Sequence, residues 1–267
     1  MTARSSGGRR PLAGGVISVL VLLLGATACD GTAANKWLSD HGRPTLSGAE
    51  LSRFAAIATT IEQELARRKA FVGEIQPVTA ERLGLSWREG CPVGPENLRL
   101  LKLSFWGMDG NGHTGELIVA ESIASKTVKV FRTLWEEKFP INRMETAEKF
   151  ARPTDFTPSG EFIESHAGPD LVNDTSAFFC RRSTGSTTNW SQHSYGTAID
   201  INPVNNPYIK GTTIIPINGA DFVRRGDQPG VITAKGPVVA AFKKAGFTWG
   251  GNWKSLKDYM HFSISGK

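Results

Sequence analysis

The 267-residue chain is poor in several features, and each shortage excludes a class of protein. It has three cysteines and no CxxC pair, so the cysteine spacing typical of small zinc domains is absent. The apolar run at residues 16–24 is far short of the ~20 apolar residues that span a membrane. The chain has no dense basic stretch, and we therefore expect no nucleic-acid partner.

The rest of the composition is that of a globular protein with one large domain or two small ones. The chain is 40% hydrophobic and 21% charged, which excludes collagen-like, coiled-coil and mostly disordered proteins. Its net charge of +6 is uneven, because residues 1–28 hold three arginines and no acid. The weak positive balance that remains is compatible with an anionic partner surface.

Residues 1–28 have the pattern of an export signal: a basic start, the apolar run at 16–24, and small residues at 25–28. Small residues directly before Cys29 resemble a bacterial lipobox, which predicts that Cys29 is lipidated and anchors the protein to a membrane. The alternative is a secretory signal that is cleaved near Ala28 without lipidation. In both cases we expect the rest of the chain at the outer face of a bacterial membrane or in the cell wall.

Two cysteines remain if Cys29 carries the lipid. Cys91 and Cys180 are isolated in the sequence, and an oxidising compartment favours a disulfide between them. A bond that closes a loop of this length stabilises a fold by roughly 4–5 kcal/mol in the chain-entropy model. The alternative, that both cysteines bind a metal, lacks the usual spacing.

The segment before Cys91 divides into a tether and a helical part. Residues 29–46 are small and polar, as in a flexible tether. Residues 47–50 have the form of a capping box, which predicts a helix from about 47 to 70 within an N-terminal segment of residues 47–90. Its apolar residues recur at three- and four-residue spacing and predict one buried face: Leu51, Phe54, Ala55, Ala58, Ile61 and Leu65.

Residues 91–267 predict one α+β domain, in which a small antiparallel sheet and flanking helices surround a single metal site. Strand patterns occur at 98–106, 116–120, 139–144, 198–202 and 261–264. A helix is predicted to end near Lys138, with an inner face formed by Ile123, Thr127, Val130, Phe131 and Leu134. A second helix is predicted at 236–245, with Pro237 in its first turn.

Several common catalytic motifs are absent or misplaced. The GxGxxG pattern at residues 110–115 precedes a strand instead of opening a helix, so it predicts a tight turn and no dinucleotide site. GxSxG, Walker A and HExxH patterns do not occur. A serine hydrolase that uses Ser191 or Ser194 with a histidine remains a minor alternative, and it would not depend on a metal.

Two separate stretches hold the residues best suited to chemistry. His193 precedes Asp200 by seven residues, with Gly196 between them, and Asp200 lies in an apolar strand where an unpaired acid is costly. Near the C-terminus, Asp258 precedes His261 by three residues. Two imidazoles and one carboxylate suffice to bind catalytic zinc with a position left for water. Each residue also has an ordinary structural interpretation, as a hydrogen-bonded histidine, a turn cap or an ion pair.

The combined motifs resemble one family. SxHxxGxAxD, followed near the C-terminus by WGGxW and DxxHF, is similar to the zinc D-alanyl-D-alanine carboxypeptidases, which include the VanY and VanX peptidases and phage L-alanyl-D-glutamate endolysins. The resemblance covers about residues 91–267. It implies a Zn²⁺ cofactor and peptidoglycan stem peptides as substrates.

The resemblance also assigns roles to residues. By position, His193, Asp200 and His261 match the family's zinc ligands, and Asp258 matches its general base. Arg181 matches the arginine that stabilises the oxyanion, with Arg182 as a second candidate. Ser191 matches a serine of the substrate pocket. Tyr195 and Trp249 are candidate pocket walls, although both could equally pack in a core.

The function implied by this resemblance is hydrolysis of a stem peptide, with a D-alanyl-D-alanine carboxypeptidase as the first expectation. Cleavage inside the stem and dipeptide cleavage stay open, because either a closed pocket or an open groove could be built from residues 203–229. A non-catalytic zinc module that binds wall peptide or a partner protein is the main alternative. Such a module has no need of Asp258 or Arg181.

Overall fold

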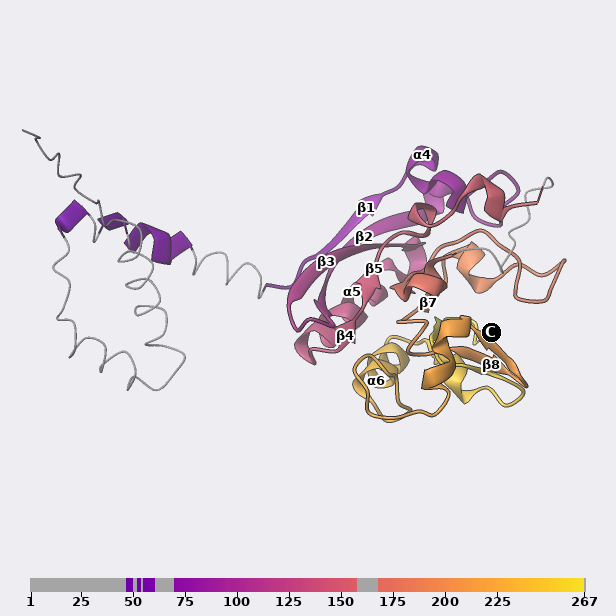
Figure 1. Cartoon of the computed structure of the whole chain (residues 1–267). Coiled ribbons are helices and arrows are strands. Elements are labelled where there is room, and N and C mark those ends of the chain that lie inside the picture. Colours follow the sequence, from indigo (N-terminus) through magenta and orange to yellow (C-terminus); the bar gives the residue numbers. More distant parts are fainter. Residues whose placement is uncertain (1–46, 50–51, 54, 61–69, 158–167, 267) are drawn as a thin grey trace, which may run out of the picture. The chain divides into compact units, whose positions relative to one another are not determined.

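The computed structural model describes residues 47–49, 52–53, 55–60, 70–157 and 168–266 (Figure 1). The chain divides into two compact units, Met1–Arg67 and Arg68–Lys267. The predicted export signal, Cys29 and the tether lie outside the described residues. No helix within the described ranges is both long and apolar enough to cross a membrane.

In the first unit, residues 48–49, 52–53 and 55–60 are helical, in agreement with the helix predicted from residue 47. Ala55 and Ala58, which we placed on a buried face, are exposed. The other apolar residues of the predicted face, Leu51, Phe54, Ile61 and Leu65, lie outside the described residues.

The second unit begins earlier than Cys91, where the sequence placed the domain boundary. Strand β1 (Gly73–Pro77) pairs antiparallel with β2 (Leu98–Gly107), and α4 (Ala80–Leu83) buries Leu83 completely. Residues 68–90 therefore belong to the domain, not to a separate helical segment. The sequence pattern did not show β1, because all five of its residues are exposed and have no apolar alternation.

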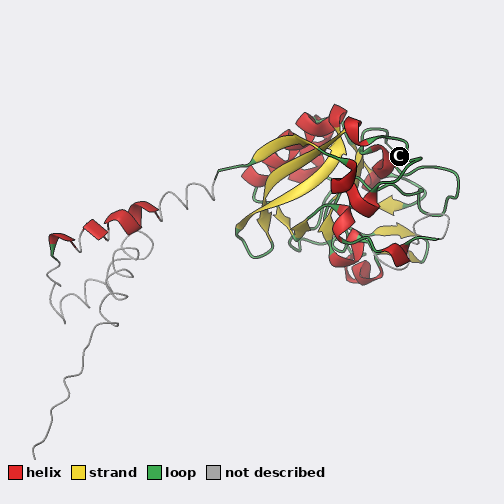
Figure 2. Ribbon diagram, turned by 90° about the horizontal axis from the view of Figure 1, so that it is seen from above, coloured by secondary structure: helices red, strands yellow, loops and turns green. Residues whose placement is uncertain are grey.

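The largest sheet contains β1, β2 and β3 (Gly112–Ala120) in antiparallel order, with β4 (Pro140–Ile141) parallel to β2. The turn between β2 and β3 has Gly110 at a φ of +73°, as the glycine pattern predicted, but residues 112–115 of that pattern are already part of β3. Helix α5 (Glu121–Glu136) packs on this sheet (Figure 2). All five residues predicted for its inner face are buried.

The remaining strands are short and form three further sheets. β5 (Arg143–Met144) pairs with β6 (Asp174–Thr175) in parallel. A second small sheet has the strand order β10 (Thr248–Trp249), β12 (His261–Ser263), β7 (Ala198–Asp200). A third has the order β11 (Lys257–Asp258), β8 (Tyr208–Lys210), β9 (Thr213–Ile215). The α+β class is thus confirmed, but several small sheets with parallel and antiparallel pairs replace the single antiparallel sheet that we expected.

Residues 139–144, predicted as one strand, form β4 and β5, which belong to different sheets. Asn142 separates them, and its backbone N–H donates to Asn202 Oδ1 at 2.9 Å. Helix α6 (Pro237–Lys244) agrees with its prediction. Short 3-10 helices connect the elements: η1 Gly84–Ser86, η2 Pro95–Asn97, η3 Ala147–Lys149, η4 Pro153–Asp155, η5 Pro169–Val172, η6 Gln192–Tyr195, η7 Ile217–Phe222 and η8 Gly250–Asn252.

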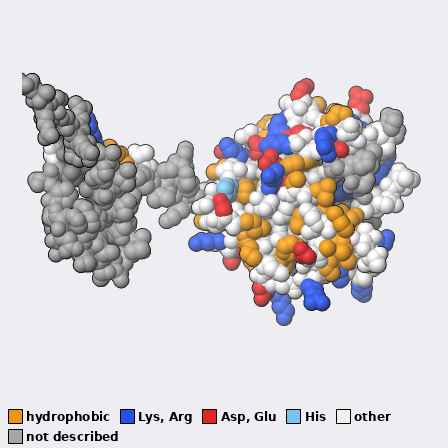
Figure 3. All heavy atoms as spheres, viewed as in Figure 1, with side chains coloured by type: hydrophobic (Ala, Val, Ile, Leu, Met, Phe, Trp, Pro, Cys, Tyr) orange, Lys and Arg blue, Asp and Glu red, His pale blue; other side chains and the backbone are white. Residues whose placement is uncertain are grey.

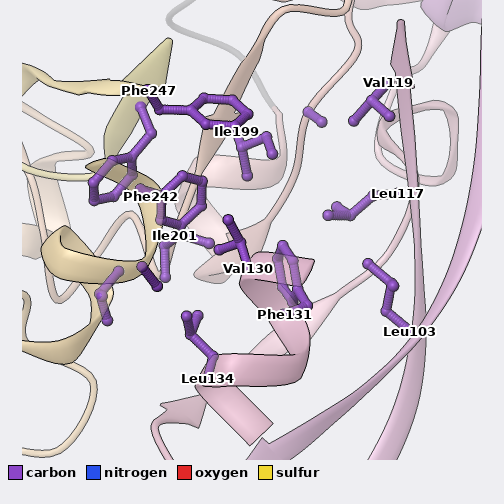
Figure 4. Packing of buried hydrophobic residues seen from close by; sticks show 14 of the residues in the cluster. Leu103, Leu117, Val119, Val130, Phe131, Leu134, Ile199, Ile201, Phe242 and Phe247 are labelled. Atoms are coloured by element: carbon purple, nitrogen blue, oxygen red, sulfur yellow. The ribbon is translucent and has the colours of Figure 1, made fainter. Parts of the chain in front are cut away.

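One apolar core connects the large sheet with the C-terminal strands (Figure 4). Side chains of α5 lie between the sheet on one side and β7 and α6 on the other. The ring of Phe262 in β12 stacks on that of Phe242 in α6, with centroids 4.0 Å apart, and both are fully buried. Strands β7 and β12 are therefore held from behind by dense packing.

Asp174 is a buried acid in β6 with an unusual titration. Its Oδ1 accepts a hydrogen bond from the Glu145 backbone N–H at 2.9 Å, while its Oδ2 is buried without a partner among the described residues. Burial raises the pKa of Asp174 to about 9, which exceeds the lowering by that hydrogen bond. In the unfolded chain the same group ionises near pH ~4. Between these values unfolding releases a proton, so stability falls as pH rises.

Asp174→Asn removes this titration. We expect the melting temperature of the wild type to fall from pH 5 to pH 8 and that of the variant to fall less, as measured by circular dichroism over the pH series. Asp221→Asn, at an exposed position, serves as the control and should keep the wild-type slope. Parallel slopes for wild type and Asp174→Asn would show that Asp174 is ionised in the folded state.

Candidate metal centre

Strand pairing brings two of the predicted ligands together. β7 and β12 are antiparallel neighbours, and Asp200 is the register partner of His261. Residues opposite each other in such a pair place their side chains on the same face of the sheet. Asp200 ends β7 and His261 begins β12, so both lie at the same edge of this small sheet.

His193 reaches this edge from η6. Ser191 caps this 3-10 helix, where its Oγ accepts from the His193 backbone N–H at 3.3 Å. Gly196 ends it with a φ of +66°, and a Cβ there would lie 2.6 Å from Ala120 N. The Gly196 carbonyl instead accepts from that Ala120 N–H at 2.8 Å. Glycine thus permits the close approach that fixes η6 against the end of β3.

Three donor atoms converge at the centre. His193 Nε2 lies 3.0 Å from Asp200 Oδ2, His261 Nδ1 lies 3.0 Å from Asp200 Oδ1, and the two ring nitrogens are 3.3 Å apart. In a tetrahedral zinc site with Zn–N bonds of about 2.0–2.1 Å, neighbouring ligand atoms are about 3.3–3.4 Å apart. His193, Asp200 and His261 therefore form a group that could bind a divalent metal such as zinc.

A hydrogen bond orients His193 for this role. Its Nδ1 lies 2.5 Å from the Ala177 carbonyl oxygen. Because a carbonyl only accepts, Nδ1 carries a proton, and Nε2 is the ring nitrogen that faces Asp200 and His261 and could bind a metal. His193, Asp200 and His261 are all buried, with 3%, 4% and 6% of their surface exposed.

The two carboxyl groups of the site differ in charge state. Burial opposes ionisation of Asp200, but the charges and hydrogen bonds of His193 and His261 outweigh it and lower the pKa of Asp200. Asp258 behaves in the opposite way, because burial, Asp200 and Asp170 raise its pKa to about 7, against a lowering by His261 and Arg181. Asp258 Oδ1 is buried and accepts no hydrogen bond from the residues that the structure describes. Asp200 thus stays ionised as a ligand, and Asp258 can exchange a proton near neutral pH.

The centre opens into a cavity of about 870 Å³, which is within the ~300–1,000 Å³ usual for small-molecule sites. It brings together seven of the residues predicted from the sequence: Arg181, Ser191, His193, Tyr195, Asp200, Asp258 and His261. Ser191 lies at the wall but also caps η6, and Tyr195 is 39% exposed.

Trp249 was a candidate pocket wall, and the structure places it in the core instead. It is 5% exposed, its Nε1–H donates to the Tyr259 carbonyl at 2.8 Å, and it does not line the large cavity. Its ring packs parallel to that of Phe262, with centroids 6.4 Å apart. The sequence pattern could not distinguish these alternatives, because β10 has only two residues.

Two other candidates are directed away from the chemistry. The Arg182 guanidinium lies over the Trp190 ring at 3.7 Å, and Arg182 does not line the cavity. Ser194 is fully buried, and its Oγ accepts from the Arg181 N–H at 2.8 Å and lies 2.6 Å from the Arg181 carbonyl. A hydroxyl held in this way cannot reach a substrate, which argues against Ser194 as the nucleophile of a serine hydrolase.

The predicted disulfide is present. Cys91 and Cys180 are bonded, with Cα atoms 6.0 Å apart. Cys180 is buried, and its backbone N–H donates to the Ser86 carbonyl at 2.9 Å. The bond therefore attaches the segment that carries Arg181 to the residues before β2.

Sequence analysis missed other residues of the site. Asp170 in η5, Tyr208 in β8 and Trp253 after η8 also line the cavity. Trp253 is part of the WGGxW motif, which is a signal that could have found it. Asp170 and Tyr208 have no such signal, since long-range folding alone brings them to the centre.

Arg225 was also missed, and it connects the loops behind Asp258. Its guanidinium donates to the carbonyls of Asn205 at 2.7 Å and Ile232 at 2.9 Å, and to Asn206 Oδ1 at 2.6 Å. It also lies 4.4 Å from the centre of the Tyr259 ring. Asn206 leads into β8, which pairs with the strand of Asp258. Arg225 thus fixes the neighbours of Asp258 on both strands.

The structure thus combines a group of residues that could bind a metal with a large cavity. Residues 184–264 match the family model described as D-alanyl-D-alanine carboxypeptidase. This match confirms the resemblance to the zinc D-alanyl-D-alanine carboxypeptidase family that the motifs indicated, and it supports a carboxypeptidase-like function. The matched segment includes His193, Asp200, Asp258 and His261, and it begins after Arg181. No solved structure matches the chain significantly.

His193→Ala should weaken zinc binding by more than ~100-fold, because even loss of a hydrogen bond to a ligand costs 10–100-fold. Zinc content after dialysis and titration calorimetry measure this. His113→Ala, at an exposed histidine that pairs with Asp109, is the control and should bind zinc as the wild type does. Unchanged zinc affinity in His193→Ala would reject this ligand set.

Arg225→Ala should lower the free energy of unfolding by about 2–3 kcal/mol, because it removes hydrogen bonds to a charged donor. Arg225→Lys keeps the charge without the planar fork and should be intermediate. Chemical denaturation measures both, with Arg224→Ala as a control at the exposed neighbouring position. If Arg225→Ala is as stable as Arg224→Ala, the network does not hold these loops.

Proposed function

We propose that the protein is a zinc-dependent peptidase that hydrolyses peptidoglycan stem peptides, with D-alanyl-D-alanine carboxypeptidase activity. One observation carries this proposal: three converging ligand atoms lie in the same cavity as a carboxyl group whose buried oxygen has no partner among the described residues. A purely structural zinc site is closed by four protein ligands and needs no such carboxyl group.

In this proposal His193, Asp200 and His261 hold the metal. Bound zinc supplies Lewis acidity toward water and toward the carbonyl oxygen of the substrate. Asp258 accepts a proton from the attacking water at Oδ1 and passes it to the nitrogen of the leaving group. A carboxyl group with a pKa of about 7 can perform both transfers at neutral pH.

Arg181 supplies the positive charge for the developing oxyanion. Two observations support this role: Arg181 lines the same cavity as His193, Asp200 and His261, and its charge lowers the pKa of Asp258. Removal of one oxyanion donor typically costs ~10²–10³-fold in rate.

The location follows as part of the same proposal. Peptidoglycan lies outside the cell membrane, so the predicted export signal and the lipid anchor at Cys29 would bring the enzyme to its substrate. On the face shown in Figure 3, Lys and Arg side chains are mixed with Asp and Glu. This mixture is unlike the continuous basic surface of a nucleic-acid-binding protein.

The main alternative is a zinc module that binds wall peptide without cleaving it. Incubation of the purified protein with a pentapeptide muropeptide, followed by mass spectrometry, separates the two. Loss of one terminal alanine that a zinc chelator blocks is the expected result. Cleavage inside the stem would keep the metal chemistry and change the bond, while binding without cleavage would favour the module.

Asp258→Asn should bind zinc normally and lower kcat by ~10²–10⁴-fold, because the amide cannot accept the proton. Mass-spectrometric assays and zinc content measure these two effects separately. Asp221→Asn, an exposed change of the same kind, should leave both unchanged. A fully active Asp258→Asn enzyme would assign the base to another group.

A further inference from the structure

A second cavity meets the metal centre from another side. It encloses about 440 Å³ and lies between η5, the segment 176–181 and the start of η7. Six residues line both cavities: Asp170, Arg181, Thr184, His193, Asp200 and Ile215. Because His193 and Asp200 are among them, a ligand at the metal centre can extend into either cavity.

The walls of the second cavity beyond these shared residues are mostly apolar: Leu171, Ala177, Phe179, Ile214, Pro216 and Ile217. The large cavity has a mixed lining, in which Thr188, Asn189 and Gln192 occur together with Trp190, Leu256 and Met260. Beyond the shared residues, the second cavity therefore offers a more uniformly apolar wall to a ligand than the large cavity does.

Leu171 and Ile217 line this cavity and are also open to solvent, with 38% and 72% of their surface exposed. Their segments are joined, since Asn218 Nδ2 donates to the Leu171 carbonyl at 3.0 Å. An exposed apolar edge of this kind can cover the methylene groups of a long side chain while its polar end stays in water.

Charge limits what the second cavity can hold. Of the described residues that line the two cavities, only Arg181 has a permanently charged basic side chain. It lines both cavities. An ionised carboxylate placed deep among the apolar walls would lose its hydration without a partner. A long aliphatic side chain buries its methylene groups there at no such cost.

We propose that the apolar cavity is a binding site for a long aliphatic side chain of the substrate. In a stem peptide this is the methylene chain of the diamino acid, with its ammonium group in water beyond Leu171 and Ile217. The methyl group of alanine is too small to cover these walls, and the carboxylate of glutamate is disfavoured by them. This inference rests on the proposed function, since it assigns the peptide substrate of the same centre.

The test measures peptide binding, so that it does not depend on turnover. Three pentapeptides differ only at the third residue, which is lysine, norleucine or alanine. Their Kd values are measured by calorimetry with zinc-loaded Asp258→Asn protein. We expect the lysine and norleucine peptides to bind at least tenfold more tightly than the alanine peptide. Equal affinities, or no binding of any peptide, would overturn the proposal.

Variants of Leu171 and Ile217 test whether the apolar cavity causes the preference for the lysine and norleucine peptides. Leu171→Ser with Ile217→Ser, in the same background, should reduce the preference to within twofold, and both positions are exposed enough to spare the fold. Val223→Ser removes another exposed apolar side chain that lines neither cavity, and it should keep the preference. A preference that survives the double substitution would place the side chain elsewhere and refute this site.

Hydrolysis by the wild type separates this inference from the proposed function. Cleavage of all three peptides, together with equal Kd values, would uphold the peptidase and reject the subsite. A clear binding preference without cleavage of any peptide would uphold the subsite and reject the peptidase.

Discussion

The direct pairing of Asp200 with His261 across β7 and β12 is the constraint on which the site depends. It fixes a carboxylate and an imidazole about 3 Å apart, and both residues are buried. Alone, a buried carboxylate is costly, and here two imidazoles compensate it. The register cannot slip by one residue, because such a slip would move Asp200 and His261 to opposite faces of the sheet.

The rest of the domain holds this pair in place. The stacked rings of Phe242 and Phe262 support β12 from behind, and the contact of Gly196 with Ala120 sets η6 against the large sheet. The disulfide attaches the Arg181 segment, and Arg225 fixes the loop that leads into β8, the strand paired with that of Asp258. These supports come from distant parts of the chain, which explains why the site needs the sheet of residues 73–120 even though the family match begins at residue 184.

The surroundings of the centre divide the chemistry between its residues. Asp200 lies between two imidazoles, which lower its pKa, whereas burial raises the pKa of Asp258 to about 7 despite the charges of His261 and Arg181. Two cavities meet at this point and share His193 and Asp200.

Local patterns in the sequence were sufficient for the long elements and for the ligand motifs. Helices α5 and α6 and strand β2 have clear apolar periodicity, and the motifs around His193 and His261 stand out by residue type and spacing. The tertiary structure alone decided the pairing of the exposed strand β1, the division of residues 139–144 between two sheets, and the burial of Trp249. It also brought Asp170 to the large cavity and Arg225 to the loops behind Asp258, and it formed the apolar cavity. These features arise from contacts between segments tens of residues apart, and such contacts leave no periodic signal in either segment.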